Sequence, residues 1–151
     1  MNRENTVAAA IIALIWLGML IGVSFLATPV KFVVQDLTLP IALQVGQATF
    51  GLFSRIEWGL AVLLVGASAW RWREGALCVI LALSAAAVVL MQAVWLLPTL
   101  DARVALIVAG ETPPPSAHHT FYATLEAAKA LMLIALAFIA LRGSARTRSH
   151  H

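Results

Sequence analysis

Four long apolar segments alternate with polar stretches along this chain. They cover residues 7–27, 50–70, 76–97 and 121–141. A helix that crosses the apolar core of a bilayer needs about 20 mainly apolar residues, and each segment reaches that length. We therefore predict an all-α fold: an integral membrane four-helix bundle with helices at these four positions.

The composition of the chain agrees with this pattern. Of its 151 residues, 62% are hydrophobic and 11% are charged, whereas a soluble domain is about one-quarter charged. The first apolar segment is too long for the core of a signal peptide, so we expect it to be retained as a helix. We expect residues 1–148 to form one domain, and residues 149–151, with His150 and His151, to be the remnant of a purification tag.

The placement of basic residues predicts how the chain is oriented. Lys31 and Arg103 lie on one side of the predicted membrane, and six arginines flank helix ends on the other. Because arginine and lysine collect on the cytoplasmic side, we expect both termini in the cytoplasm of a bacterial cell and the helices in its inner membrane. Topology accounts for these charges, so we predict the lipid bilayer and not nucleic acid as a partner. The six arginines are Arg3, Arg71, Arg73, Arg142, Arg146 and Arg148.

The chain also shows a weak internal repeat. A shift of 69 residues places Pro29 on Pro98 and Glu57 on Glu126 without gaps, and each glutamate follows its proline by 28 residues. We interpret this as two helical hairpins related as a parallel pseudo-repeat, with an axis along the membrane normal. In this interpretation Pro29 and Pro98 end the first and third helices.

Two glutamates lie inside predicted membrane helices, where a carboxylate is costly and by default indicates a functional site. Glu57 and Glu126 are therefore our candidate ligands or proton carriers. Lys129 follows Glu126 by three residues, a spacing at which the two can pair on one helix face. Arg55 precedes Glu57 by two residues, so the two point to different faces. Lys129 and Arg55 are the candidate charge partners.

These residues predict a polar pocket that opens toward the outer side. Two converging carboxylates can bind a cation, or share a proton, because two close anions do not ionise independently. The leading hypothesis is binding or transport of a cation or small solute, with no certain cofactor. A bound metal cation would take Glu57, Glu126 and His119 as ligands. Tyr122 and Gln92 are expected to line the pocket, and His118 and His119 to lie at its mouth.

The rival hypothesis is a structural or accessory subunit whose buried charges hold the helices together. An enzyme finds little support, because the sequence has no Ser-His-Asp candidate set, no phosphate-binding glycine loop and no HExxH motif. The single cysteine, Cys78, excludes an internal disulfide, and we expect it to be a small buried hydrophobic residue. Gly18 and Gly22 form a GxxxG motif that serves either packing within the bundle or a homodimer.

The chain resembles the transmembrane protein 205-like group of small four-helix membrane proteins, most of which are uncharacterised. The resemblance lies in Phe25-Leu26-Ala27-Thr28-Pro29, Trp95-Leu96-Leu97-Pro98 and Phe121-Tyr122. It implies a four-helix bundle and, in eukaryotic relatives, a link to tolerance of metal drugs. It also implies histidine at the positions of Glu57 and Glu126, where this chain departs from the pattern.

Overall fold

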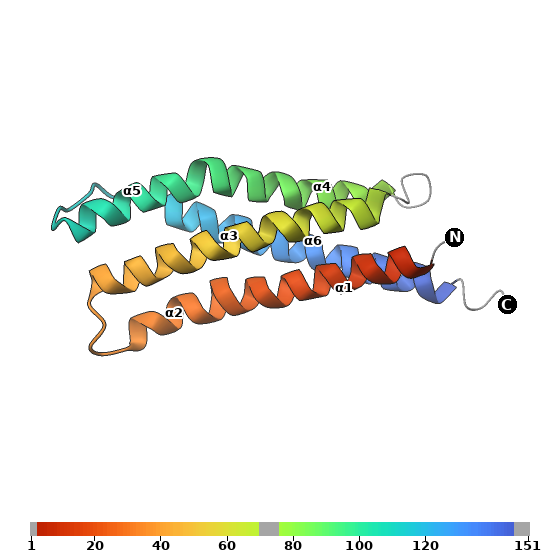
Figure 1. Cartoon of the computed structure of the whole chain (residues 1–151), viewed down its shortest axis with the longest axis horizontal. Helices are drawn as coiled ribbons and strands as arrows, with labels where there is room; N and C mark the ends of the chain where they lie inside the picture. The colour runs from red at the N-terminus through yellow and green to blue at the C-terminus, as the bar shows by residue number, and fades with distance from the viewer. Residues whose placement is uncertain (1–2, 70–75, 147–151) are drawn as a thin grey trace.

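The protein is a bundle of four long antiparallel helices, seen in a computed structural model that describes residues 3–69 and 76–146. The first helix begins and the last helix ends at the same end of the bundle, and we call the opposite end the distal end (Figure 1). The described residues contain no strand. The predicted link at 70–75, Arg148, His150 and His151 lie outside them.

Four helical spans are long and apolar enough to cross a membrane: Glu4–Val33, Leu39–Ala69, Ala76–Val108 and His118–Gly143. Their length and composition identify a membrane protein, and large apolar side chains are exposed along all four. Four helices at the predicted positions are therefore confirmed for the described residues, which exclude residue 70, and each span is longer than its predicted segment. In chain order the elements are α1 (Arg3–Leu20), η1 (Ile21–Ala27), α2 (Thr28–Val30), η2 (Lys31–Val33), α3 (Leu39–Ala69), α4 (Ala76–Met91), η3 (Gln92–Leu96), α5 (Leu97–Val108) and α6 (His118–Arg146).

The prediction that Pro29 and Pro98 end the first and third helices is wrong. The chain stays helical through both, because each proline follows a π-helical segment, η1 or η3. A proline has no N–H, and its ring clashes with the carbonyl four residues earlier. The wider π turn relieves that clash, so the helix continues. The third span instead ends at Val108, two residues before Gly110, which adopts a positive φ of 85°.

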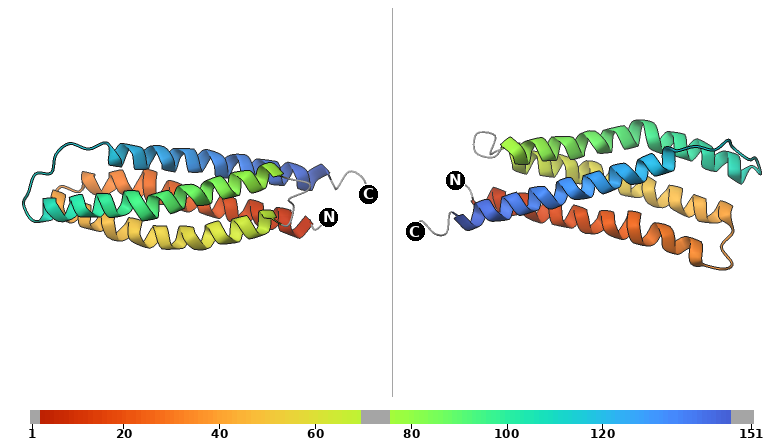
Figure 2. Two further views of the ribbon diagram at one scale, coloured as in Figure 1. Left: turned by 90° about the horizontal axis from the view of Figure 1, so that it is seen from above. Right: turned by 180° about the vertical axis from the view of Figure 1, so that it is seen from behind.

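Each long helix packs against two neighbours, α1 against α3 and α6, and α4 against α3 and α6. The views in Figure 2 show the four helices running alongside one another over most of their length. The core toward the termini is built largely from small side chains, which let helix backbones approach closely. It includes Ala9, Ala13, Ala61, Ala82, Ala85 and Ala137, with Leu64, Leu133 and Leu136 between them. Cys78 is buried in this core, as predicted.

Gly18 and Gly22 are not used for close packing within the bundle. A Cβ built on either glycine would meet no atom within 4 Å, and Gly18 is exposed. Of the two roles predicted for this motif, packing between helices of one chain therefore finds no support. A homodimer through Gly18 and Gly22 stays a prediction.

Candidate functional site

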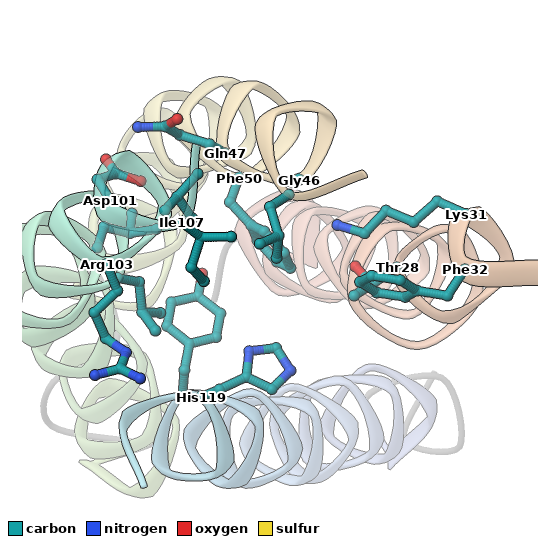
Figure 3. A pocket seen from close by; sticks show the side chains of 15 residues that line it. Thr28, Lys31, Phe32, Gly46, Gln47, Phe50, Asp101, Arg103, Ile107 and His119 are labelled. Atoms are coloured by element: carbon teal, nitrogen blue, oxygen red, sulfur yellow. The ribbon is translucent and has the colours of Figure 1, made fainter. Parts of the chain in front are cut away.

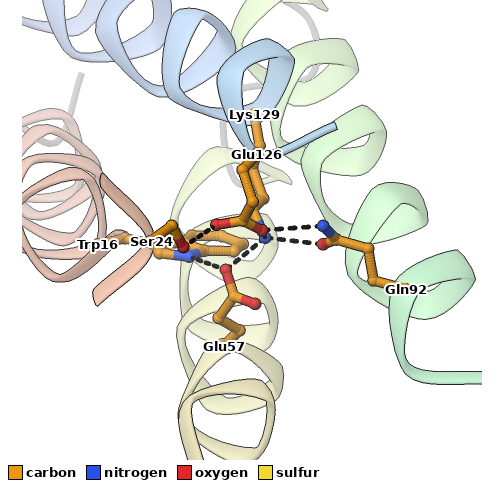
Figure 4. Close-up of polar contacts among 6 residues, drawn as sticks. All are labelled: Trp16, Ser24, Glu57, Gln92, Glu126 and Lys129. Carbon is orange, nitrogen blue, oxygen red and sulfur yellow. Dashed lines mark hydrogen bonds and ion pairs between the residues drawn. The ribbon is translucent and has the colours of Figure 1, made fainter. Parts of the chain in front are cut away.

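A buried lysine, Lys129 of α6, holds the two intramembrane glutamates together. Its Nζ lies 2.5 Å from Glu57 Oε1 on α3 and 2.7 Å from Glu126 Oε1, one turn earlier on α6. The same Nζ donates a hydrogen bond of 2.9 Å to Gln92 Oε1 of η3 (Figure 4). An ammonium group has three N–H donors, and these three contacts account for all of them.

The two carboxylates receive further hydrogen bonds from the other helices. Trp16 Nε1 donates to Glu57 Oε1 at 2.9 Å. Gln92 Nε2 donates to Glu126 Oε1 at 2.8 Å, and the Ser24 hydroxyl donates to Glu126 Oε2 at 2.7 Å. These six residues form one hydrogen-bonded charge network, to which all four spans contribute (Figure 4).

Local structure explains how these side chains meet. Glu126 and Lys129 are three residues apart in α6, so they share a helix face. Ser24 lies in η1 and Gln92 in η3, the two π-helical segments that precede the prolines. A π turn shifts the helix register locally and recurs at functional sites. Here the two π-helical segments carry Ser24 and Gln92, and both side chains donate hydrogen bonds to Glu126.

The charge network is isolated from solvent and places two carboxyl groups beside one amino group. The exposed fractions of Glu57 and Glu126 are 1% each, and that of Lys129 is 0%. Two ionised carboxylates beside one ammonium carry a net charge of −1. A net charge inside a membrane protein is costly. One further positive charge, such as a proton on either carboxylate, makes the network neutral.

A pocket of about 200 Å³ lies toward the distal end from this network. Thr28, Gly46, Phe50, His119 and Tyr122 are among the residues that line it. Thr28 is four residues beyond Ser24, and Tyr122 four residues before Glu126, so the pocket begins about one helical turn from the network. The side chains around this cavity come from all four spans (Figure 3).

The predicted site residues fall into three groups. Lys129 pairs with both glutamates, and its contact with Glu126 is the one that their spacing predicted. Tyr122 and His119 line the pocket, whereas Gln92 belongs to the charge network below it. His118 does not line the pocket; its ring contacts Ser116 Oγ and lies nearly perpendicular to the Trp95 ring. Arg55 is exposed on α3 and lies outside the network.

The three-ligand metal set of Glu57, Glu126 and His119 does not come together. Within residues 3–69 and 76–146, no group of three or more His, Cys, Asp or Glu side chains is placed to hold a metal ion. Lys129 accounts for the two carboxylates, because its ammonium lies between them where a metal ion would bind, and His119 lies seven residues before Glu126, about two helical turns away.

No family model, curated protein or solved structure matches this chain. The resemblance to the transmembrane protein 205-like group therefore stays a prediction.

Sequence reasoning did not identify Trp16 as a site residue. Trp16 lies well inside the first span and is fully buried. A tryptophan at the membrane surface can leave its indole N–H in the polar interface. The indole N–H of a buried tryptophan instead needs a hydrogen-bond acceptor. The position of Trp16 within the uncharged segment 7–27 was therefore a signal for a polar acceptor on another helix.

We expect Trp16→Phe to destabilise the protein by about 1.5–3 kcal/mol, because it removes a hydrogen bond to a buried carboxylate. The measurement is the free energy of unfolding in detergent. Trp58→Phe is the matched control, since Trp58 is 40% exposed. Equal losses in the two variants would show that the bond from Trp16 to Glu57 contributes little.

Proposed function

We propose that this membrane protein binds and releases a proton at the charge network, and binds a small solute in the adjacent pocket. The observation that carries the proposal is the sharing of one ammonium, Lys129, by two buried carboxylates. Such a network is neutral with one added proton and carries −1 without it. Proton exchange is the reaction that this imbalance favours.

A proton fits this network better than a metal ion does. A metal ion would have to displace the Lys129 ammonium, whose hydrogen bonds are directed at Glu57, Glu126 and Gln92. A proton adds to a carboxylate oxygen and needs no additional space. The cation of our original hypothesis is therefore proposed to be a proton.

The pocket supplies the place for the solute. It begins about one helical turn from Glu126 and lies at the distal end, away from both termini. With Arg3 and Arg142 near the termini, we propose that both termini face the cytoplasm and that the pocket faces the outside of a bacterial inner membrane. A solute that enters there would bind close to the group that exchanges the proton.

Infrared difference spectroscopy tests the proton exchange. Spectra of the purified protein at two pH values report carboxyl groups that gain or lose a proton. We expect a protonated-carboxyl band in the wild type that is lost in Glu57→Gln or in Glu126→Gln. Glu111→Gln is the control, because Glu111 is exposed in the loop before α6. Identical bands in all four proteins would contradict the proposal.

A structural role is the second candidate, favoured by a specific observation. The charge network joins all four spans, so its hydrogen bonds hold the bundle together at one level. In this case the carboxyl groups keep one protonation state over the whole pH range in which the protein stays folded. The infrared experiment thus separates the two functions.

A further inference from the structure

The pocket at the distal end combines an apolar wall with several basic side chains. Its apolar lining comes from the first, second and third spans, and includes Phe32, Leu43, Phe50, Leu97, Val104 and Ile107. Lys31, Arg103 and His119 also line it, and Asp101 is the acidic residue among the lining side chains. With Lys31, Arg103 and Asp101 ionised, the pocket has a net charge of +1 before His119 is counted.

The acidic residue does not neutralise Lys31. Asp101 lies beside Gln47 on the side of the pocket formed by α5 and α3, whereas Lys31 reaches in from the first span (Figure 3). Over the part of the chain that the structure describes, Lys31 has no ion pair or hydrogen bond, and its Nζ lies 5.1 Å from the centre of the Phe32 ring. The pocket therefore contains a cation that lacks an anionic partner.

Gly46 makes room for this ammonium. A Cβ built on Gly46 would overlap the Nζ of Lys31, and its next neighbour is the Cε of the same lysine at 3.6 Å. Gly46 is buried, and Figure 3 shows the Lys31 side chain extended toward it. The absence of a side chain at Gly46 is thus what lets the charge lie against α3 inside the pocket.

Tyr122 provides an independent second observation. It lines the pocket, its exposed fraction is 4%, and its hydroxyl has no hydrogen-bond partner among the described residues. A buried hydroxyl without a partner is unfavourable in the empty protein. A ligand oxygen in the pocket would supply the missing acceptor.

We propose that this pocket binds an anionic amphiphile, a molecule with a carboxylate or phosphate head and an apolar chain. The head would contact Lys31 and the Tyr122 hydroxyl, with Arg103 adding positive charge and His119 offering a ring N–H as a donor. The chain would lie against the apolar wall and leave toward the lipid-facing surface, where Phe32 is 53% exposed. This inference rests on the proposed function for the presence of a solute in the pocket, and it does not depend on proton exchange.

The test uses the whole protein in nanodiscs of phosphatidylcholine, with the melting temperature as the readout. A ligand that binds the folded protein raises this temperature. Decanoate and decyl phosphate are the probes. Decanol has the chain without the charge, decyltrimethylammonium has the opposite charge, and acetate and inorganic phosphate are heads without a chain. We expect stabilisation by at least one probe and by none of these four controls.

A further experiment asks whether the anionic head group comes from a membrane lipid or from a molecule dissolved in water. Nanodiscs that contain phosphatidylglycerol offer the anion as a membrane lipid, whereas decanoate and decyl phosphate offer it from water. Stabilisation by either source supports the proposal and identifies where the ligand comes from. Stabilisation by neither source, or equal stabilisation by decanol, would overturn it.

Two variants locate the binding site, with a matched control. Gly46→Ala should weaken probe binding about tenfold, because the new methyl group displaces the Lys31 ammonium. Gly51→Ala, in the same helix, should leave binding unchanged, since its Cβ would meet nothing within 4 Å. Equal binding by Gly46→Ala and Gly51→Ala would place the ligand elsewhere and overturn the proposal.

Tyr122→Phe tests whether the Tyr122 hydroxyl contacts the ligand or only affects the stability of the protein. Without the unpartnered hydroxyl, the empty protein should melt at a higher temperature while probe binding weakens. Loss of stability together with unchanged binding would show that the hydroxyl does not contact the ligand. The infrared experiment on Glu57 and Glu126 is separate, so each of the two proposals can fail alone.

Discussion

Lys129→Met destabilises the protein by about 3–5 kcal/mol, the expected loss when one partner of a buried ion pair is removed. The change leaves Glu57 and Glu126 facing each other without the ammonium that both contact. It also removes the donor to Gln92 Oε1. The measurement is the free energy of unfolding in detergent, compared with the wild type.

Lys31→Met is the matched control for this prediction. It replaces a lysine that has no ion pair in the described part of the chain, so its effect on stability should be small. The variant Lys129→Met/Glu57→Gln/Glu126→Gln should recover most of the loss, because it contains no buried charge at this site. A triple variant as unstable as Lys129→Met would mean that packing, and not charge, determines the effect.

The double variant Glu57→Gln/Glu126→Gln is expected to cost much more than its two single variants together. Either single change leaves one carboxylate to pair with Lys129, and that pair is neutral. The double change leaves the ammonium alone in a site where its exposed fraction is 0%. We expect an interaction energy of about 1–3 kcal/mol between the two substitutions.

The check is a double-mutant cycle on the free energy of unfolding. Gln keeps the size and much of the hydrogen-bonding capacity of Glu, so the cycle reports mainly on charge. Additive losses would indicate that Glu57 and Glu126 do not share Lys129. The same variants also enter the infrared experiment, which separates a loss of stability from a loss of proton exchange.

The charge network also bears on how the helices assemble. On α6 Glu126 and Lys129 form a neutral pair within one helix. On α3 Glu57 has no such partner at helical spacing, because Arg55 is exposed on another face. A lone carboxylate in the bilayer is costly, so Glu57 gains most from docking α3 against α6 and Trp16. The network thus favours one arrangement of the spans over others of similar apolar packing.

Much of the architecture could be predicted from the sequence. Apolar length alone fixes four helices, because a backbone inside a bilayer must satisfy its own hydrogen bonds. Glu57, Glu126 and Lys129 stand out because charge is rare in such helices. The spacing of three between Glu126 and Lys129 predicts their contact, which the structure confirms.

The partners of these residues were decided by tertiary structure. Nothing in the local sequence says that Trp16 donates to Glu57, or that Ser24 and Gln92 both reach Glu126, since these contacts depend on how four helices rotate against one another. The helix ends at Pro29 and Pro98 were mispredicted for a related reason. A proline usually stops a helix, and here a π turn before each one lets it continue.

For the pocket too, the sequence predicts some features and the tertiary structure decides the others. The sequence indicated that Lys31 and Arg103 belong to the end of the bundle away from the termini, because they follow the first and third of four predicted helices. Only the folded chain brings Lys31 onto Gly46, which is 15 residues away, and leaves the hydroxyl of Tyr122 without a partner. Helix length and charge are local properties of the chain. Contacts between helices depend on the packing of all four spans together.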